Sequence, residues 1–337
     1  MRRVRVAAGC GASGSAAGIR PFCFILPLAL AGAAAHAEPP YPARALRLVV
    51  PSSPGGGADI SARIIAPKLS EALGQQVVVE NRPGASTMIG GEAVARAAPD
   101  GYTLLLGIST LAINPAIYRK IPYDALKDFA PVSQLVSLPN LLVTHPSLPV
   151  ATVKELVALA RARPGQIHYA SAGVGTNPHF SMELFLSMAG LRMVHVPYKG
   201  SGRGIVEVIA GQVPVMMPSI LAGLPHAKSG RLRALGVTSA KRAGGAPGIP
   251  TIAEAGVPGY EAVQWFGVLA PAATPREIVS RLHGEIVRAL HSPEVRGRFA
   301  ADGADPVGST PEEFAAFLRA ETAKWAKVAQ EAGIRPE

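Results

Sequence analysis

Short apolar segments with the character of β-strands alternate with helical segments along most of this 337-residue chain. The first part shows the pattern clearly, with strands expected at 48–50, 76–80 and 102–106 and helices at 58–73 and 86–97. Such alternation is typical of α/β layers built around parallel sheets. We therefore expect an α/β fold whose ligand site lies beyond the carboxyl ends of the strands.

The strand at 48–50 leads into a helix through a glycine turn, Gly55-Gly56-Gly57. Pro51 and Pro54 end the strand, because neither ring nitrogen can donate to a ladder. The first N–H groups of a helix lack intrahelical acceptors, and together with the helix dipole they attract an anion. The spacing matches neither glycine template for nucleotides. The turn predicts a cradle for a small anion, or simply the packing of a strand on a helix.

A second glycine turn, from Ser171 to Pro178, follows a strand expected at 168–170. We expect Asn177 as its N-cap and Pro178 as the first helical residue. Extended apolar segments between the two turns indicate a crossing into a second lobe, and a similar segment at 260–271 indicates the return. We expect lobe 1 to comprise residues 38–138 and 263–337, and lobe 2 to comprise 139–262.

The first 37 residues have the features of a secretory signal peptide. Four arginines precede an apolar run at 21–35, and Ala35-His36-Ala37 offers an A-x-A cleavage site. The run is shorter than the roughly 20 apolar residues that a membrane span needs. We expect cleavage after Ala37 and a periplasmic protein.

Composition excludes several classes of site. Both cysteines, Cys10 and Cys23, lie in the leader, so the mature chain would have no disulfide or thiolate. The leader holds four of the 33 basic residues and none of the 23 acidic ones, which leaves a net charge of +6. That charge favours anionic solutes or simply solubility. Without basic runs between aromatics, or histidines at metal-ligand spacing, we expect no nucleic acid, metal or cofactor.

Motifs along the whole mature chain resemble one family. They are LVVP at 48–51, PGGGAD at 54–59, VENRPGA at 79–85, APDGYTL at 98–104, YASAG at 169–173, VHVPYKG at 194–200, VTSAKR at 237–242 and WFGV at 265–268. In this order they are similar to the Bug-type solute-binding proteins, the extracytoplasmic receptors of tripartite tricarboxylate transporters.

The resemblance implies a two-lobed periplasmic binding protein of type II-like fold, each lobe a central sheet flanked by helices. Such a protein would close on a small carboxylate, deliver it to the membrane permease subunits of the transporter, and act as a monomer without enzymatic activity. Carried over by position, lobe 1 contacts fall at Ser52, Ser53, Gly55, Gly56, Gly57, Asp59, Ala85, Ser86, Thr87, Met88, Ser109 and Thr110. Lobe 2 contacts fall at Ser171, Gly173, Gly175, Thr176, Asn177, His179, Pro218 and Ser219.

Departures from the family pattern suggest which carboxylate is bound. Members commonly have an aspartate or asparagine pair near Pro218-Ser219, where an aspartate could neutralise a ligand ammonium group. Our hypothesis is a carboxylate without an amino group, with Met88, Met216 or Met217 forming an apolar wall for a hydrophobic or aromatic tail. The alternative is that the methionines belong to the core.

Some residues and functions stay open. His179 could touch the ligand or be satisfied by local backbone. Lys199 and Arg203 could add positive potential at the cleft mouth or be solvated charges. A ligand sensor for a membrane signalling protein would use the same fold. A secreted serine hydrolase is the other alternative, but no G-x-S-x-G elbow accompanies the serines.

Overall fold

The computed structural model describes residues 11, 12, 14, 41–301 and 303–331. The chain separates into two units, Met1–Glu38 and Pro39–Glu337, and the helices and strands of the described residues all belong to the second. The expected signal peptide, its cleavage site after Ala37 and both cysteines lie outside the described residues. Among the described helices, none combines the length and hydropathy that a membrane span requires.

Sheet 1 is six-stranded and mixed. Its spatial order is β11 (Asp305–Pro306), β4 (Phe129–Pro139), β10 (Val263–Pro271), β3 (Thr103–Ile108), β1 (Leu46–Val50) and β2 (Val77–Asn81). The strands β1, β2 and β3 pair in parallel, as the alternation predicts. Strand β10 pairs antiparallel with both β3 and β4, because it is the segment that brings the chain back from the other sheet. The sheet is therefore parallel where strands and helices alternate and antiparallel where the chain returns.

Sheet 2 is five-stranded and also mixed. Its order is β7 (Val194–Pro197), β6 (His168–Ser171), β8 (Val215–Met216), β5 (Leu141–Thr144) and β9 (Arg233–Val237). The chain leaves sheet 1 at Pro139, enters sheet 2 at Leu141 and re-enters sheet 1 at Val263. Only the residues before 140 and after 262 contribute strands to sheet 1 in the described chain.

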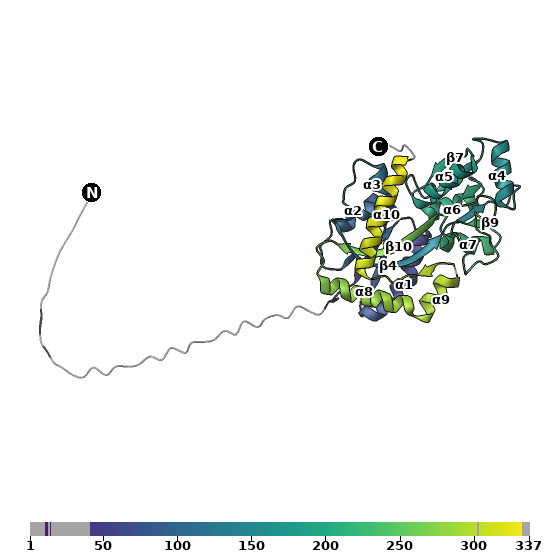
Figure 1. The fold of residues 1–337 in the computed structure, drawn as a ribbon. Helices are drawn as coiled ribbons and strands as arrows, with labels where there is room; N and C mark the ends of the chain where they lie inside the picture. Colours follow the sequence, from purple (N-terminus) through teal and green to yellow (C-terminus); the bar gives the residue numbers. More distant parts are fainter. Residues whose placement is uncertain (1–10, 13, 15–40, 302, 332–337) are drawn as a thin grey trace, which may run out of the picture. The chain divides into compact units, whose positions relative to one another are not determined.

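Helices pack against both sheets. Those that follow strands of sheet 1 are α1 (Gly57–Leu73), η1 (Ala85–Thr87), α2 (Met88–Ala95), α3 (Thr110–Ile117), α8 (Arg276–His291), α9 (Pro293–Ala301) and α10 (Pro311–Glu331). Those between strands of sheet 2 are α4 (Val153–Ala162), α5 (Asn177–Ala189), α6 (Ser201–Ile209) and α7 (Ile220–Lys228). The last long helix, α10, lies against β4 and α3 (Figure 1).

Buried apolar side chains of the two sheets join in one cluster. Val136 of β4 and Phe266 of β10 belong to it, and so do Val143 of β5 and Ile220 of α7. Continuous apolar runs such as Leu104-Leu105-Leu106 in β3 are fully buried, as expected for strands covered on both faces. The two sheets therefore share a core where the chain crosses between them.

Several predicted elements need correction. The helix expected at 86–97 divides into η1 and α2 around residues with positive φ. Helix α5 begins at Asn177 with Thr176 as its N-cap, one residue earlier than predicted. Sequence patterns did not predict α3, α7, α9 or β11. In α3 and α7 an internal proline, Pro115 or Pro225, breaks the usual helical pattern.

Candidate functional site

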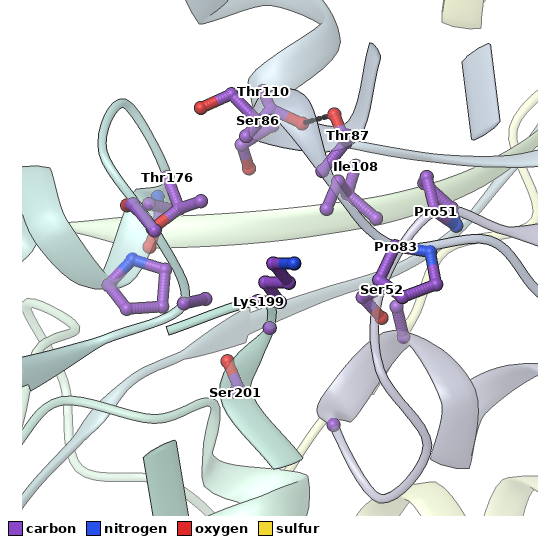
Figure 2. A pocket seen from close by; sticks show the side chains of 18 of the residues that line it. Pro51, Ser52, Pro83, Ser86, Thr87, Ile108, Thr110, Thr176, Lys199 and Ser201 are labelled. Carbon is purple, nitrogen blue, oxygen red and sulfur yellow. Dashed lines mark hydrogen bonds between the residues drawn. The ribbon is translucent and has the colours of Figure 1, made fainter. Parts of the chain in front are cut away.

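A pocket of about 290 Å³ lies between elements of the two sheets. From the sheet 1 side it is lined by Pro51, Ser52, Gly56, Gly57, Ala58, Pro83, Gly84, Ala85, Ser86, Thr87, Ile108, Ser109, Thr110, Tyr118, Gln264 and Phe266. From the sheet 2 side it is lined by Ala172, Gly173, Val174, Thr176, Asn177, Pro178, Pro197, Tyr198, Lys199, Gly200, Ser201 and Ser219. Figure 2 shows these two sets facing one another.

Besides α2, whose uncapped N-cap Thr87 also lines the pocket, five helices direct their N-termini at it. The N-cap residues Gly56, Ser109, Thr176, Gly200 and Ser219, which precede α1, α3, α5, α6 and α7, all line it. In none of the five does a side chain cap the helix by a hydrogen bond. Unsatisfied N–H groups and the positive ends of five helix dipoles therefore converge on one volume.

Two helices that start away from the pocket are capped in the ordinary way. Thr152 accepts from the N–H of Glu155 at 3.2 Å at the start of α4. At α10, Thr310 and Glu313 form a reciprocal capping box, with bonds of 2.9 and 3.1 Å. Capping away from the pocket is not universal, since α8 begins after Pro275 without a side-chain cap. At the pocket, a bound anion could take the place of the side-chain cap.

The pocket lining carries a positive side-chain charge and no negative one. No Asp or Glu lines the pocket in the described chain, and Lys199 is the charged side chain among the lining residues. The hydroxyls of Ser52 and Ser219 are buried and find no partner among the described residues. A buried unsatisfied hydroxyl costs about 1–3 kcal/mol, so both groups favour a ligand that hydrogen-bonds to them. The site is suited to an anion.

A strained turn forms one wall of the pocket. Ala85, Ser86 and Thr87 have φ values of 45°, 47° and 74°, a conformation that costs an L-residue about 1–2 kcal/mol. The turn is held by Asn114, which donates to the Ser86 carbonyl at 2.9 Å, and by a 2.6 Å bond between Thr87 and the Thr110 hydroxyl (Figure 2). Strain kept by so many contacts is typical of a functional segment.

Ser86 also connects the two sides of the pocket. Its hydroxyl donates to the carbonyl of Val174, which belongs to the loop between β6 and α5. Because that proton is used, Tyr118 donates to Ser86 Oγ, at 3.0 Å. The strained turn of the sheet 1 side thus holds the glycine loop of the sheet 2 side.

A buried amide network lies where the chain crosses between the sheets. Asn140, fully buried, donates to Asn177 at 2.7 Å and to Ser181 at 2.8 Å, and it accepts from Gln264. Asn177 in turn donates to the carbonyl of Val263 at 3.0 Å. The network therefore fixes the start of α5 relative to both crossing segments, and its amides are used within the protein.

Most of the sequence-predicted residues come together at the pocket. The lining includes Ser52, Gly56, Gly57, Ala85, Ser86, Thr87, Ser109, Thr110, Gly173, Thr176, Asn177 and Ser219. Eight of the predicted residues are absent from the lining: Ser53, Gly55, Asp59, Met88, Ser171, Gly175, His179 and Pro218.

Asp59, Gly55 and Gly175 form hydrogen bonds within the loops that carry the lining residues. Asp59 accepts from the Gly55 N–H at 2.9 Å and pairs with Arg63 at 3.0 Å, so its carboxylate is turned away from the pocket. Gly175 donates to His179 Nδ1 at 3.3 Å. These contacts shape the turns, and Asp59, Gly55 and Gly175 lie outside the lining of the pocket.

None of the three methionines lines the pocket, and their positions fit the alternative that they belong to the core. Met216 is fully buried in the cluster that the two sheets share, and Met217 is fully buried in a second cluster, within sheet 2 and its helices. Met88 packs against the core cluster around α2. Pro218 is buried too, and its carbonyl accepts from the N–H of Leu141 at 2.9 Å. Apolar pocket surface comes instead from Pro51, Pro83 and Ile108 (Figure 2).

Ser171 and His179 belong to a cluster outside the pocket lining. The ring of His179 stacks on that of His195 at 4.1 Å, and Ser171 Oγ lies 2.6 Å from His195 Nε2. Ser171 is fully buried, so this serine and histidine pair is closed to a substrate. Burial lowers the pKa of both imidazoles to about 4, and the neighbouring His179 adds to the effect on His195.

We expect this cluster to make stability depend on pH. The folded pKa values lie below the ordinary value of 6.5, so the neutral rings contribute full stability above about pH 6.5. That contribution declines as the pH falls through about 4. Urea unfolding between pH 7.5 and 5 tests this, because ordinary carboxylates stay ionised there. The double variant His179→Gln, His195→Gln should show a shallower decline, and an equally steep one would contradict the assignment.

One loop of the pocket lining was not predicted from the sequence. Pro197, Tyr198, Gly200 and Ser201 all line the pocket, between β7 and α6. The signal was present, because this is a third strand-to-helix junction with a glycine just before the helix. Tyr118, Gln264 and Phe266 gave no such signal. No group of three or more metal-binding side chains suited to a metal occurs among the residues that the structure describes.

Comparisons with known proteins agree with this architecture. A family model described as the tripartite tricarboxylate transporter family receptor matches residues 61–334. The chain is 41% identical to protein BugT of Bordetella pertussis over 88% of this chain and 91% of BugT. It is 41% identical to the structure of R. palustris Rpa4515 with adipate, with a TM-score of 0.85 and coverage of 88% and 100%. The periplasmic binding protein BugD is 31% identical, also with a TM-score of 0.85, over 88% of this chain and 100% of BugD.

Proposed function

The chain belongs to the tripartite tricarboxylate transporter receptor family, and we propose that it captures a small carboxylate between two lobes and delivers it to the membrane permease subunits of such a transporter. The family is one of solute-binding receptors and not of enzymes. One relative of similar size was solved with adipate, a carboxylate. The proposed lobes are residues 38–138 with 263–337, and residues 139–262.

The observation that carries the proposal is the convergence of five uncapped helix N-termini on a pocket without acidic side chains. Each helix end contributes about 0.3–2 kcal/mol toward an anion, depending on burial. A carboxylate has enough lone pairs to accept from several N–H groups at once. The proposed contacts are therefore the twelve predicted residues that line the pocket.

The positions of these groups support lobe closure. Helices α1 and α3 start on the sheet 1 side, and α5, α6 and α7 start on the sheet 2 side. One carboxylate can accept hydrogen bonds from the helix N-termini of both sides only when the two sides are in contact. Because that interaction is stronger in the closed form, it shifts the equilibrium toward closure. The hinge would be the crossing segments held by Asn140 and Gln264.

The lining also supports a finer proposal for the ligand. No carboxylate lines the described pocket, so a ligand ammonium group would have no counter-ion there. We therefore favour a carboxylate without an amino group. Its apolar skeleton, aliphatic or aromatic, would lie against Pro51, Pro83 and Ile108. We further propose a periplasmic monomer that needs no cofactor, with the leader removed after Ala37.

Thermal unfolding with a ligand panel tests the proposal. Purified protein is first unfolded and refolded to remove carried-over ligand, and then heated with mono-, di- and tricarboxylates, aromatic acids, acidic amino acids and neutral amides. Binding to the native state adds about 2.7 kcal/mol at a hundredfold excess over Kd. We expect a rise in Tm with one class of plain carboxylates. No shift with any carboxylate, or the largest shift with glutamate or aspartate, would contradict it.

A further inference from the structure

A small apolar cluster outside the pocket lining joins the two sides of the protein. Its buried members are Ile113, Ala116 and Ile117 of α3 and Ala329 of α10, with Tyr118, Phe180 and Trp325 packed against them. Helices α3 and α10 belong to the sheet 1 side, where α10 packs against both α3 and β4. Among the described members of this cluster, Phe180 of α5 is the one that comes from the sheet 2 side. A side chain of one side is therefore seated in an apolar cluster of the other.

Phe180 is anchored to the sheet 2 side and contacts Trp325 of the sheet 1 side. Its N–H donates to the carbonyl of Thr176 at 3.0 Å in the first turn of α5. Further along α5, Met182 and Phe185 are fully buried in the core cluster of sheet 2. The rings of Phe180 and Trp325 lie 5.6 Å apart at 45°. The contact between these two rings therefore depends on how closely the two sides approach each other.

This ring contact is separate from the pocket but moves with it. Neither Phe180 nor Trp325 lines the pocket, whereas Asn177, at the start of the same helix, does. The loop before α5 also packs on the sheet 1 side, since a Cβ built on Gly175 would lie 2.3 Å from Ile117 Cδ1. Separation of the two sides would open the pocket and withdraw Phe180 from Trp325 in one movement.

Building on the proposed function, we infer that Phe180 and Trp325 form a closure contact, which is made only in the closed form and strengthens the binding of every ligand without touching it. Apolar surface buried only in the closed form favours closure, as any interaction confined to that form does. Phe180 and Trp325 are thus positioning residues, and they set affinity without setting specificity. Their contact must also break before a ligand leaves, so it slows dissociation.

Calorimetric titration of refolded protein tests this inference, with adipate, malate, citrate and benzoate as probes. Phe180→Ala should weaken every probe that binds by the same factor, about tenfold or 1.4 kcal/mol, and leave the Tm without ligand unchanged. Leu184→Ala is the matched control, because Leu184 is an exposed apolar side chain of the same helix outside the cluster. Trp325→Ala should cause a similar loss. The double variant should lose no more than either single one, because both remove the same contact.

Tryptophan fluorescence reports the closure contact directly. Trp325 is half-buried, whereas Trp265 is buried in the core of the sheet 1 side. A saturating probe should shift the emission to shorter wavelength as Trp325 leaves water, and Trp325→Phe should abolish the shift.

Three results would overturn the inference and leave the carboxylate receptor standing. They are wild-type affinity in Phe180→Ala, a loss confined to one of several bound probes, and an emission spectrum that does not change when a probe binds. If no probe binds the wild type, the proposed function fails and the closure contact fails with it.

Discussion

Replacing Gly202 with alanine is expected to lower the affinity for carboxylates by about 100-fold, or about 2.8 kcal/mol, while the protein stays folded. Gly202 is the second residue of α6, on the sheet 2 side. A Cβ built there would lie 1.9 Å from the carbonyl oxygen of Pro54 and 3.2 Å from the backbone nitrogen of Gly56. Both atoms belong to backbone of the sheet 1 side, so they cannot rotate away. Alanine should hold the two sides apart.

The loss should appear in binding and not in the fold, because alanine favours the helix that contains it. An alanine in place of a helical glycine adds about 1 kcal/mol to helix stability. Gly297→Ala in α9 is the matched control, since a Cβ there meets nothing within 4 Å. Calorimetry should show unchanged affinity for Gly297→Ala and weak binding for Gly202→Ala. Wild-type affinity in Gly202→Ala would mean that this close approach does not accompany ligand binding.

Replacing Ser201 with aspartate is expected to reduce carboxylate binding by a similar factor. Ser201 is the first residue of α6, lines the pocket and is shown beside Lys199 in Figure 2. A carboxylate about 5 Å from the ligand's own carboxylate costs about 3 kcal/mol at an effective dielectric constant of about 20. The aspartate carboxylate would also pair with the ammonium group of Lys199, which would then no longer be available to the ligand.

The neutral variant Ser201→Asn isolates the charge, because asparagine has nearly the same shape as aspartate. An acidic residue in the first turn stabilises a helix, so Ser201→Asp should unfold at no lower temperature than the wild type without ligand. Titrations should give weak binding for aspartate and at most a modest loss for asparagine. If the two variants bind a carboxylate equally well, the positive potential of the pocket is not what attracts the ligand.

The sequence predicts the parts of the site that begin or end at a glycine or a proline. Pro51 and Gly57 delimit the junction between β1 and α1, and the helix begins within one residue of the prediction. The second glycine turn is predicted as well, although Asn177 enters the helix because Asn140 and Val263 engage its side chain. Glycine and proline act through local backbone sterics, which a sequence reveals directly.

The features of the site and fold that were not predicted from the sequence depend on tertiary contacts. Gly84 marks the start of the strained turn, but the three residues that follow are not glycines, and their positive φ values are held by Asn114, Thr110 and the facing loop. Helices α3 and α7 contain prolines, and their burial overrides weak propensity. The role of Gly202 is visible only when Pro54 is placed against it.

The most direct test of the account is a crystal structure of the protein with the carboxylate that gives the largest thermal shift. We expect one carboxylate group within hydrogen-bonding distance of backbone N–H groups at the starts of α1 and of a helix from the sheet 2 side, with Gly202 against Pro54. A carboxylate bound only through Lys199, with the helix N-termini of the sheet 1 side facing solvent, would contradict it.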